Sequence, residues 1–143
     1  MTPSGTVWET YVAAIQHDLA QLDGGEYLAG VARRPTPWFH AAVDANYPEL
    51  GPPADLLEET KARQEDMQMQ GLCEEGALNA AWETVEFERR YREYLADSAE
   101  APDSMETLAQ RVRDGEDVVL VCYEGDGKRC HRHVLREELA AQI

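Results

Sequence analysis

Lysine is almost missing from this sequence, and positive charge in general is scarce. Only Lys61 and Lys128 are lysines, the other eleven of the 13 basic residues are arginines, and 28 acidic residues bring the formal net charge to −15. General, sequence-independent binding to nucleic acid needs a basic surface, so this composition argues against it. A cationic partner would fit the charge, but a uniformly acidic, solvated surface explains it more simply. Such acid-rich, lysine-poor surfaces resemble those of proteins from salt-loving archaea, and we expect a source of that kind.

Long apolar segments and cysteines are also few. No window approaches the roughly 18 apolar residues of a membrane span, and residues 1–5 have neither the basic start nor the apolar run of a signal peptide. Three cysteines, an odd number, fit a reducing compartment. We therefore expect a soluble, cytoplasmic protein without a membrane partner. The 143 residues give room for one domain over 1–143.

What the sequence does contain is an alternation of strand-like and helix-like segments. β-Branched and aromatic residues predict strands over 6–15 and 26–32, and the apolar run at 117–123 predicts a fully buried strand. Apolar residues at three- and four-residue spacings, with Ser104 as one capping residue, predict the helices. These helices span about 38–43, 54–69, 74–97, 105–113 and 130–143. The order predicts an α/β domain with a mainly parallel sheet and a long helical middle segment.

Two windows without acidic residues are unusual in so acidic a chain. Residues 27–43 contain Arg33 and Arg34, and residues 127–136 contain a second group of bases, Lys128, Arg129, Arg132 and Arg136. Each window begins at or soon after the carboxyl end of a predicted strand, and ligands of open α/β sheets bind at that edge. We expect the windows to converge on one electropositive pocket, helped by N–H groups at the start of the last helix. The alternative is that these arginines only pair with nearby acids.

Cys122 is a candidate nucleophile because it ends the buried strand shortly before a helix begins. Backbone amides aimed at such a sulfur favour its thiolate, and Glu124 or His131 would then move protons. The spacing differs from that of a phosphatase loop, because Lys128 stands six residues on, where such a loop has arginine. Glu124 would also repel a phosphate. A buried structural thiol therefore remains an open alternative.

Zinc is the other chemistry that the side chains of this segment allow. Cys122, Cys130, His131 and His133 are suitable ligand types for that ion. Their spacing is poor, because seven residues separate the cysteines and the adjacent Cys-His pair cannot easily face one ion. The sequence therefore predicts no metal site and no cofactor.

The same segment closely resembles the signature of an uncharacterised family, domain of unknown function 488. That signature has a buried strand ending in Cys-x-Glu, a short loop and Cys-His-Arg on a helix, which residues 120–124 and 130–132 match. Weaker similarity lies in residues 31–35, 47–51 and 87–94. Where many members have Asp-Val-Arg-x-x-Pro, this chain has Gly-Val-Ala-Arg-Arg-Pro at 30–35. The resemblance implies a small Rossmann-like domain, and it brings no established activity, substrate or cofactor.

These observations predict a domain that binds a small anionic, phosphate-bearing molecule. The predicted ligand-binding residues are Arg33, Arg34, Lys128, Arg129, Cys130 and Arg132, and the candidate catalytic residues are Cys122, Glu124 and His131. Two alternatives stay open: a nucleic-acid-associated binding module, and a non-catalytic structural domain with a Cys/His cluster. The sequence decides neither whether the protein is an enzyme nor what its oligomeric state is.

Overall fold

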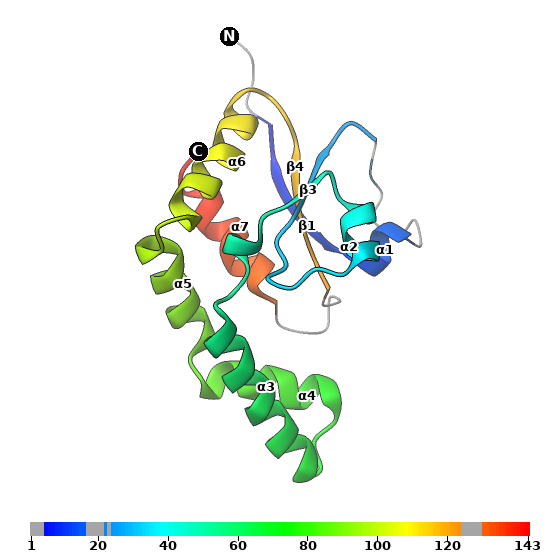
Figure 1. Ribbon diagram of the computed structural model, residues 1–143, viewed down its shortest axis with the longest axis vertical. Coiled ribbons are helices and arrows are strands. Elements are labelled where there is room, and N and C mark those ends of the chain that lie inside the picture. The colour runs from blue at the N-terminus through cyan, green and yellow to red at the C-terminus, as the bar shows by residue number, and fades with distance from the viewer. Residues whose placement is uncertain (1–4, 17–21, 23, 124–129) are drawn as a thin grey trace.

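A parallel sheet forms the centre of the fold. The computed structural model describes residues 5–16, 22, 24–123 and 130–143. Its four-stranded sheet has the order β1-β4-β2-β3, and every strand pair is parallel (Figure 1). The strands are β1 Val7–Tyr11, β2 Tyr27–Gly30, β3 Ala45–Asn46 and β4 Val118–Cys122. The predicted fold class, a small Rossmann-like α/β domain with a parallel sheet, is confirmed.

Helices cover both faces of this sheet, and a helical hairpin projects away from it (Figure 1). The helices α5, α6 and α7 pack against one face, and the short α1 and α2 lie on the other. The hairpin consists of α3 and α4, which together with α5 and α6 make up the predicted helical middle segment. The helical bounds are α1 Val12–Gln16, α2 Pro37–Ala42, the 3₁₀ turn Pro48–Leu50, α3 Ala54–Met69, α4 Glu74–Thr84, α5 Phe87–Asp97, α6 Ala101–Arg113 and α7 His131–Ala140.

β4 lies inside the sheet, which explains its unbroken apolar sequence. All five of its residues are buried, because a strand covered by helices on both faces has no solvent-facing side. Val118, Leu120 and Cys122 pack into the larger core with residues of α5, α6 and α7. Val119 and Val121 pack into the smaller core on the opposite face.

The strand register brings three carboxyl ends to one edge of the sheet. Tyr11 pairs with Cys122 at the ends of β1 and β4, and Gly30 at the end of β2 pairs with Val121. The first turn of α7 begins at the same edge, because His131 bonds to the backbone of Val31 just beyond β2. This is the edge at which open α/β sheets bind ligands.

The first strand is shorter than predicted. The pattern over 6–15 predicts one strand, whereas β1 ends at Tyr11 and the chain turns directly into α1. Tyr11 pairs with the last residue of β4, so residues beyond it have no strand to pair with. Val12 and Ala14 are instead buried through α1, in a helix that the β-branched residues of this segment concealed.

The helix predicted over 74–97 is two helices. The chain breaks between α4 and α5 at Glu86, whose φ of 55° lies in the left-handed region that non-glycine residues rarely adopt. The turn brings the rings of Trp82 and Phe87 into a stack with centroids 3.7 Å apart. Both rings are buried, so packing of two aromatic side chains accompanies the interruption of the helical repeat.

Two smaller differences concern α6 and β3. α6 begins at Ala101 rather than after Ser104, with Pro102 in its first turn, where proline is favoured. Ser104 therefore does not cap the helix, and its hydroxyl donates to the carboxylate of Glu49. The pattern did not predict β3, because two residues are too few to show a strand period.

Candidate functional site

A cavity of about 200 Å³ opens at the carboxyl edge of the sheet. Its wall comes from the segment after β2, the end of β4, the start of α7 and one residue of α3. The lining residues are Ala32, Arg33, Arg34, Pro52, Leu57, Cys122, Tyr123, Cys130 and His131. The structure thus brings together five of the nine predicted site residues. Among the others, Arg132 lies close to Cys122, and Glu124, Lys128 and Arg129 lie outside the described residues.

Asn46 of β3 fixes the backbone that leads into this cavity. Its side-chain Oδ1 accepts from the Ala32 N–H at 3.1 Å, and its Nδ2 donates to the Ala32 carbonyl at 3.0 Å. Gly30 makes room for this clamp, because a Cβ there would lie 2.7 Å from Asn46 Oδ1. Although it has only two residues, β3 positions the segment that carries Arg33 and Arg34.

Tyr123 holds the far end of the same segment against β4. Its hydroxyl accepts from the Thr36 N–H at 2.8 Å, and Thr36 in turn caps α2. The ring packs against Phe39 and Trp38, with centroids 4.7 and 5.7 Å away. Residues 32–36 are therefore held at both ends.

Arg33 lines the cavity and also holds the neighbouring loop in place through hydrogen bonds. Its Nε donates to the Pro52 carbonyl and its Nη2 to the Gly51 carbonyl, both at 2.9 Å. Nη2 also donates to the Tyr94 hydroxyl at 2.7 Å. A Cβ on Gly51 would lie 2.5 Å from Arg33 N, so glycine permits this close approach. Arg33 thus contributes positive charge to the wall while it anchors the loop ahead of α3.

Arg34 is the more accessible of the two arginines. Its side chain is 65% exposed and lies 3.4 Å from the equally exposed carboxylate of Glu58. An ion pair of this kind contributes little free energy because water screens it. Arg34 can therefore turn toward an anion in the cavity at small cost.

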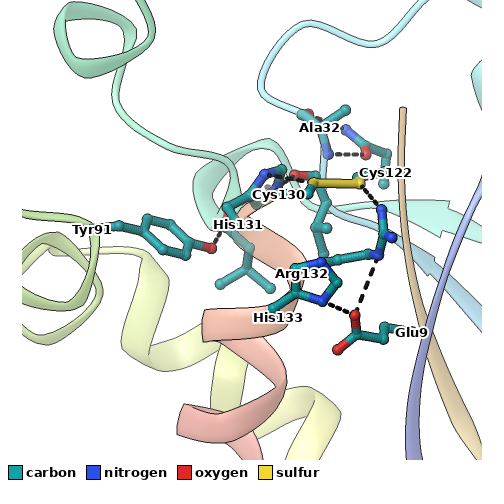
Figure 2. The surroundings of a disulfide bond; sticks show 11 residues. Glu9, Ala32, Tyr91, Cys122, Cys130, His131, Arg132 and His133 are labelled. Atoms are coloured by element: carbon teal, nitrogen blue, oxygen red, sulfur yellow. Dashed lines mark hydrogen bonds and ion pairs between the residues drawn. A yellow bond between two sulfur atoms is a disulfide. The ribbon is translucent and has the colours of Figure 1, made fainter. Parts of the chain in front are cut away.

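Cys122 and Cys130, which both line the cavity, are joined by a disulfide bond (Figure 2). Cys122 ends β4 and Cys130 is the N-cap residue of α7. Both cysteines are buried. The sequence predicts a nucleophile at Cys122 and a ligand-binding residue at Cys130, and it does not predict a bond between them. The pairing follows from the topology, because α7 starts beside the edge at which β4 ends.

Arg132 does not line the cavity, but it lies against the sulfur of Cys122, which does. Its guanidinium is 1% exposed, and Nη1 donates to Cys122 Sγ at 2.8 Å (Figure 2). The guanidinium carbon also lies 5.8 Å from the centre of the Tyr11 ring. A buried guanidinium beside sulfur stabilises a thiolate over a thiol. Arg132, which the sequence predicts to bind an anionic ligand, therefore lies where its charge acts on the sulfur of Cys122.

Glu9 of β1 is a residue of this site that the sequence interpretation missed. Its carboxylate is 14% exposed, lies 3.4 Å from Arg132 Nε and 3.7 Å from Arg136 Nη1, and contacts His133 Nδ1. Alternation in β1 puts Glu9 on the same face as Val7 and Tyr11, toward α7. An acid at an inward position of a strand was the available signal. Glu9 holds Arg132 in place and neutralises part of its buried charge.

His131 is a buried, neutral histidine. Its Nε2 lies 2.5 Å from the Val31 carbonyl, which can only accept, so Nε2 carries the proton and Nδ1 is the acceptor. Nδ1 lies 3.6 Å from Cys130 Sγ, and the edge of the ring meets Tyr91. Burial, with the charges of Arg132, His133 and Arg33 adding to it, lowers the pKa of His131 to about 4. Its role in proton transfer stays a prediction.

Neither a metal cluster nor a membrane-spanning helix is present in the part of the chain that the structure describes. Within the described ranges, no three His, Cys, Asp or Glu side chains are grouped so that they could hold a metal ion. No helix in that part of the chain has the length and apolar character needed to cross a bilayer.

Comparison with known proteins gives one match. The family model DUF488-N3a, described as the active DUF488-N3 subclade, matches residues 10–143. The match covers the last two residues of β1, the other three strands, the hairpin and every residue that lines the strand-edge cavity. Neither a curated protein nor a solved structure matches the chain.

Proposed function

We propose that this chain, which belongs to the DUF488-N3a family, binds a small anionic, phosphate-bearing molecule in the strand-edge cavity. One observation carries the proposal. In a protein with a net charge of −15, the cavity is lined by Arg33 and Arg34 and has no carboxylate among its lining residues that the structure describes. An anion is attracted to this site, whereas most of the acidic surface repels it.

The start of α7 supports the same ligand class. Cys130 makes no side-chain hydrogen bond to the first turn of the helix. The N–H groups of that turn point toward the helix start, where the macrodipole favours negative charge. With His131 neutral, the lining positive charges are those of Arg33 and Arg34. A phosphate group suits such donors, because guanidinium and backbone N–H groups bind its oxygens in pairs.

Cys122 adds a catalytic possibility to this binding site, in agreement with the word "active" in the family description. Cys122 lines the cavity, and the guanidinium of Arg132 lies against its sulfur, which becomes a thiol once the disulfide is reduced. The guanidinium favours the thiolate, the reactive form of cysteine. A reducing cytoplasm, which the odd number of cysteines favours, would supply the reduced form. Glu124 and His131 remain the candidates for moving protons.

Binding of inorganic phosphate to the reduced protein tests the proposal. We expect saturable amide shifts confined to residues 31–36 and 130–133 when phosphate is titrated at constant, high ionic strength. Arg34→Gln should weaken the affinity about tenfold, the usual effect of losing one charge-assisted contact. Arg63→Gln is the matched control, because Arg63 is an exposed arginine of α3 outside the cavity. Unchanged amides in both segments would refute the anion site.

The disulfide favours a second candidate, a structural domain in which the cysteines only staple β4 to α7. The bond closes a loop with a sequence separation of 8, which corresponds to about 2 kcal/mol of stabilisation in the chain-entropy description. We would measure urea unfolding of a Cys73→Ser variant with and without reductant. A staple requires a loss of that size on reduction together with no binding of phosphate. Equal stability in both states would exclude it.

A further inference from the structure

A second cavity lies next to the strand-edge cavity, on the side of the helical hairpin. It has a volume of about 300 Å³ and lies between α3, α4 and the start of α7. Leu57, Cys130 and His131 line both cavities. The two cavities therefore adjoin at Leu57 of the hairpin and at the start of α7.

The chemistry of the two cavities differs. The strand-edge cavity has two arginines, whereas the hairpin cavity has a mostly apolar wall formed by Leu57, Leu78, Trp82 and Phe87. The stacked rings of Trp82 and Phe87 make this wall broad and rigid. A cavity of this character takes a flat, apolar group rather than an anion.

Polar groups stand on one face of α3 in the same cavity. Leu57, Thr60, Lys61 and Gln64 all line it, at the three- and four-residue spacing that places side chains on one side of a helix. Thr60 donates its hydroxyl proton to the Leu56 carbonyl at 2.7 Å, and Gln64 Nε2 donates to the Glu74 carbonyl at 3.3 Å. Their oxygens still have acceptor capacity, so this face can accept hydrogen bonds from a ligand that has N–H groups at its rim.

Lys61 is unusual because the chain has so few lysines. It is exposed, and it forms no ion pair with another residue of the described ranges. No acid lines the hairpin cavity in that part of the chain either. Among the described residues, both cavities thus have basic lining residues and no acidic ones.

Size separates a whole ligand from a bare anion. The strand-edge cavity, at about 200 Å³, is smaller than the 300–1,000 Å³ typical of small-molecule sites. The adjacent hairpin cavity, at about 300 Å³, adds enough volume for a ligand of that size to occupy both. A free phosphate would leave the larger, apolar part empty.

We propose that the ligand has two parts, an anionic group in the strand-edge cavity and a planar ring with polar edges in the hairpin cavity, as in a nucleotide. This inference rests on the proposed anion site and adds to it the ring-binding function of α3 and α4. Leu57 and His131 then contact the portion that joins the two parts. In this arrangement, α3 and α4 determine which ring is bound, and the strand-edge cavity binds the charged group.

Three probes test the inference by calorimetry on the reduced protein: inorganic phosphate, phenyl phosphate and adenosine monophosphate. Phenyl phosphate should bind at least about tenfold more tightly than phosphate, the factor expected for burying one ring. Adenosine monophosphate should bind more tightly still, because its base has N–H groups for Thr60 and Gln64. Equal affinities for phenyl phosphate and adenosine monophosphate would show that Thr60 and Gln64 do not recognise the polar edge of the ring.

Leu78→Trp fills the hairpin cavity and should reduce the affinity for both organic phosphates to that for inorganic phosphate, which should not change. Leu72→Trp is the matched control, because Leu72 lies at the exposed tip of the hairpin outside the cavity. Gln64→Ala, a milder change, should lower the affinity for adenosine monophosphate about fivefold and leave phenyl phosphate unchanged. Far-UV circular dichroism checks that each variant is folded.

Failure of this inference is distinct from failure of the proposed function. If phosphate binds but all three probes have the same affinity and Leu78→Trp changes nothing, the ring site is refuted and the anion site stands. If adenosine, added as a fourth probe that has no phosphate, binds while inorganic phosphate does not, the anion site is wrong. If no probe binds, both proposals fail.

Discussion

Arginine is used in opposite ways on the two sides of α7. On the solvent side, Arg92 of α5 lies 2.6 Å from Glu137, contacts Glu138 and bonds to Glu88 within its own helix, with its side chain 32% exposed. On the sheet side, Arg132 is 1% exposed and reaches Cys122 and Glu9. Removing a guanidinium from water is costly unless its surroundings compensate, whereas an exposed one costs little. The comparison indicates that Arg132 is placed for the sulfur of Cys122, and Arg92 for the surface.

The largest effect should come from Arg132. Arg132→Met leaves the carboxylate of Glu9 without its buried guanidinium, and losing one partner of such a pair costs about 3 to 5 kcal/mol. Urea unfolding of the oxidised protein measures the loss. If Arg132→Met were no more destabilising than Arg92→Met, the distinction between the two sides of α7 would fail.

The Arg132→Met variant also tests whether Arg132 stabilises the thiolate of Cys122 or only packs against its neighbours. In a Cys73→Ser, Cys130→Ser background, Cys122 is the remaining thiol, and its alkylation by iodoacetamide can be followed against pH. Arg132→Met should move the midpoint of that profile to higher pH, because the guanidinium no longer stabilises the thiolate. Arg132→Lys should restore part of the shift. A purely structural Arg132 would leave the midpoint in place.

An intermediate effect is expected from pH, through His131 at the start of α7. Burial lowers its pKa to about 4 in the folded protein, compared with about 6.5 in an unfolded chain. Between those values the unfolded state binds more protons, so the contribution to stability is complete above pH 6.5 and is lost as the pH falls toward 4. The loss amounts to about 3 kcal/mol over that window.

His131→Gln provides the control for this pH dependence. Glutamine can still donate to the Val31 carbonyl but does not titrate. The free energy of unfolding of the variant should therefore fall less steeply between pH 6.5 and 4, and subtracting the two profiles removes the contribution of the many carboxylates. Parallel profiles would show that His131 is not held neutral.

The smallest effect should come from Arg92. Arg92→Met removes partly exposed ion pairs, each worth less than about 1 kcal/mol. The loss should shrink as salt rises, because salt screens exposed charges far more than buried ones. Thermal unfolding at low and at molar salt measures this. A loss of stability as large as that of Arg132→Met, and insensitive to salt, would show that the ion pairs of Arg92 stabilise the fold as much as the buried guanidinium of Arg132 does.

The parts of the site that the sequence predicted are those that depend on neighbouring residues. The apolar run of β4 indicated a buried strand, and the absence of acids around Arg33 and after residue 127 indicated a cationic pocket. Both follow from local composition, because burial selects apolar residues and an anion site excludes carboxylates. Arg33 and Arg34 do line one cavity with Cys122, Cys130 and His131.

The parts that were missed depend on contacts between distant segments. Glu9 is 123 residues from Arg132 in the sequence, and its inward position in β1 does not show which residue it contacts. The break at Glu86 arises where Trp82 and Phe87 stack, and a continuous apolar period concealed it. The clamp of Asn46 on Ala32 likewise needs the β2–β3 pairing.

By itself, the amino-acid sequence determined the α/β class, the family and the segments that meet at the strand edge, because hydrophobic period, charge and a short motif are written locally. Tertiary structure alone decided the partners within that edge. It joined Cys122 to Cys130, placed Arg132 behind the sulfur with Glu9 holding it, and set a ring-lined cavity of the hairpin beside the arginines. These relations are distances between remote residues, and only the packing of helices on the sheet creates them.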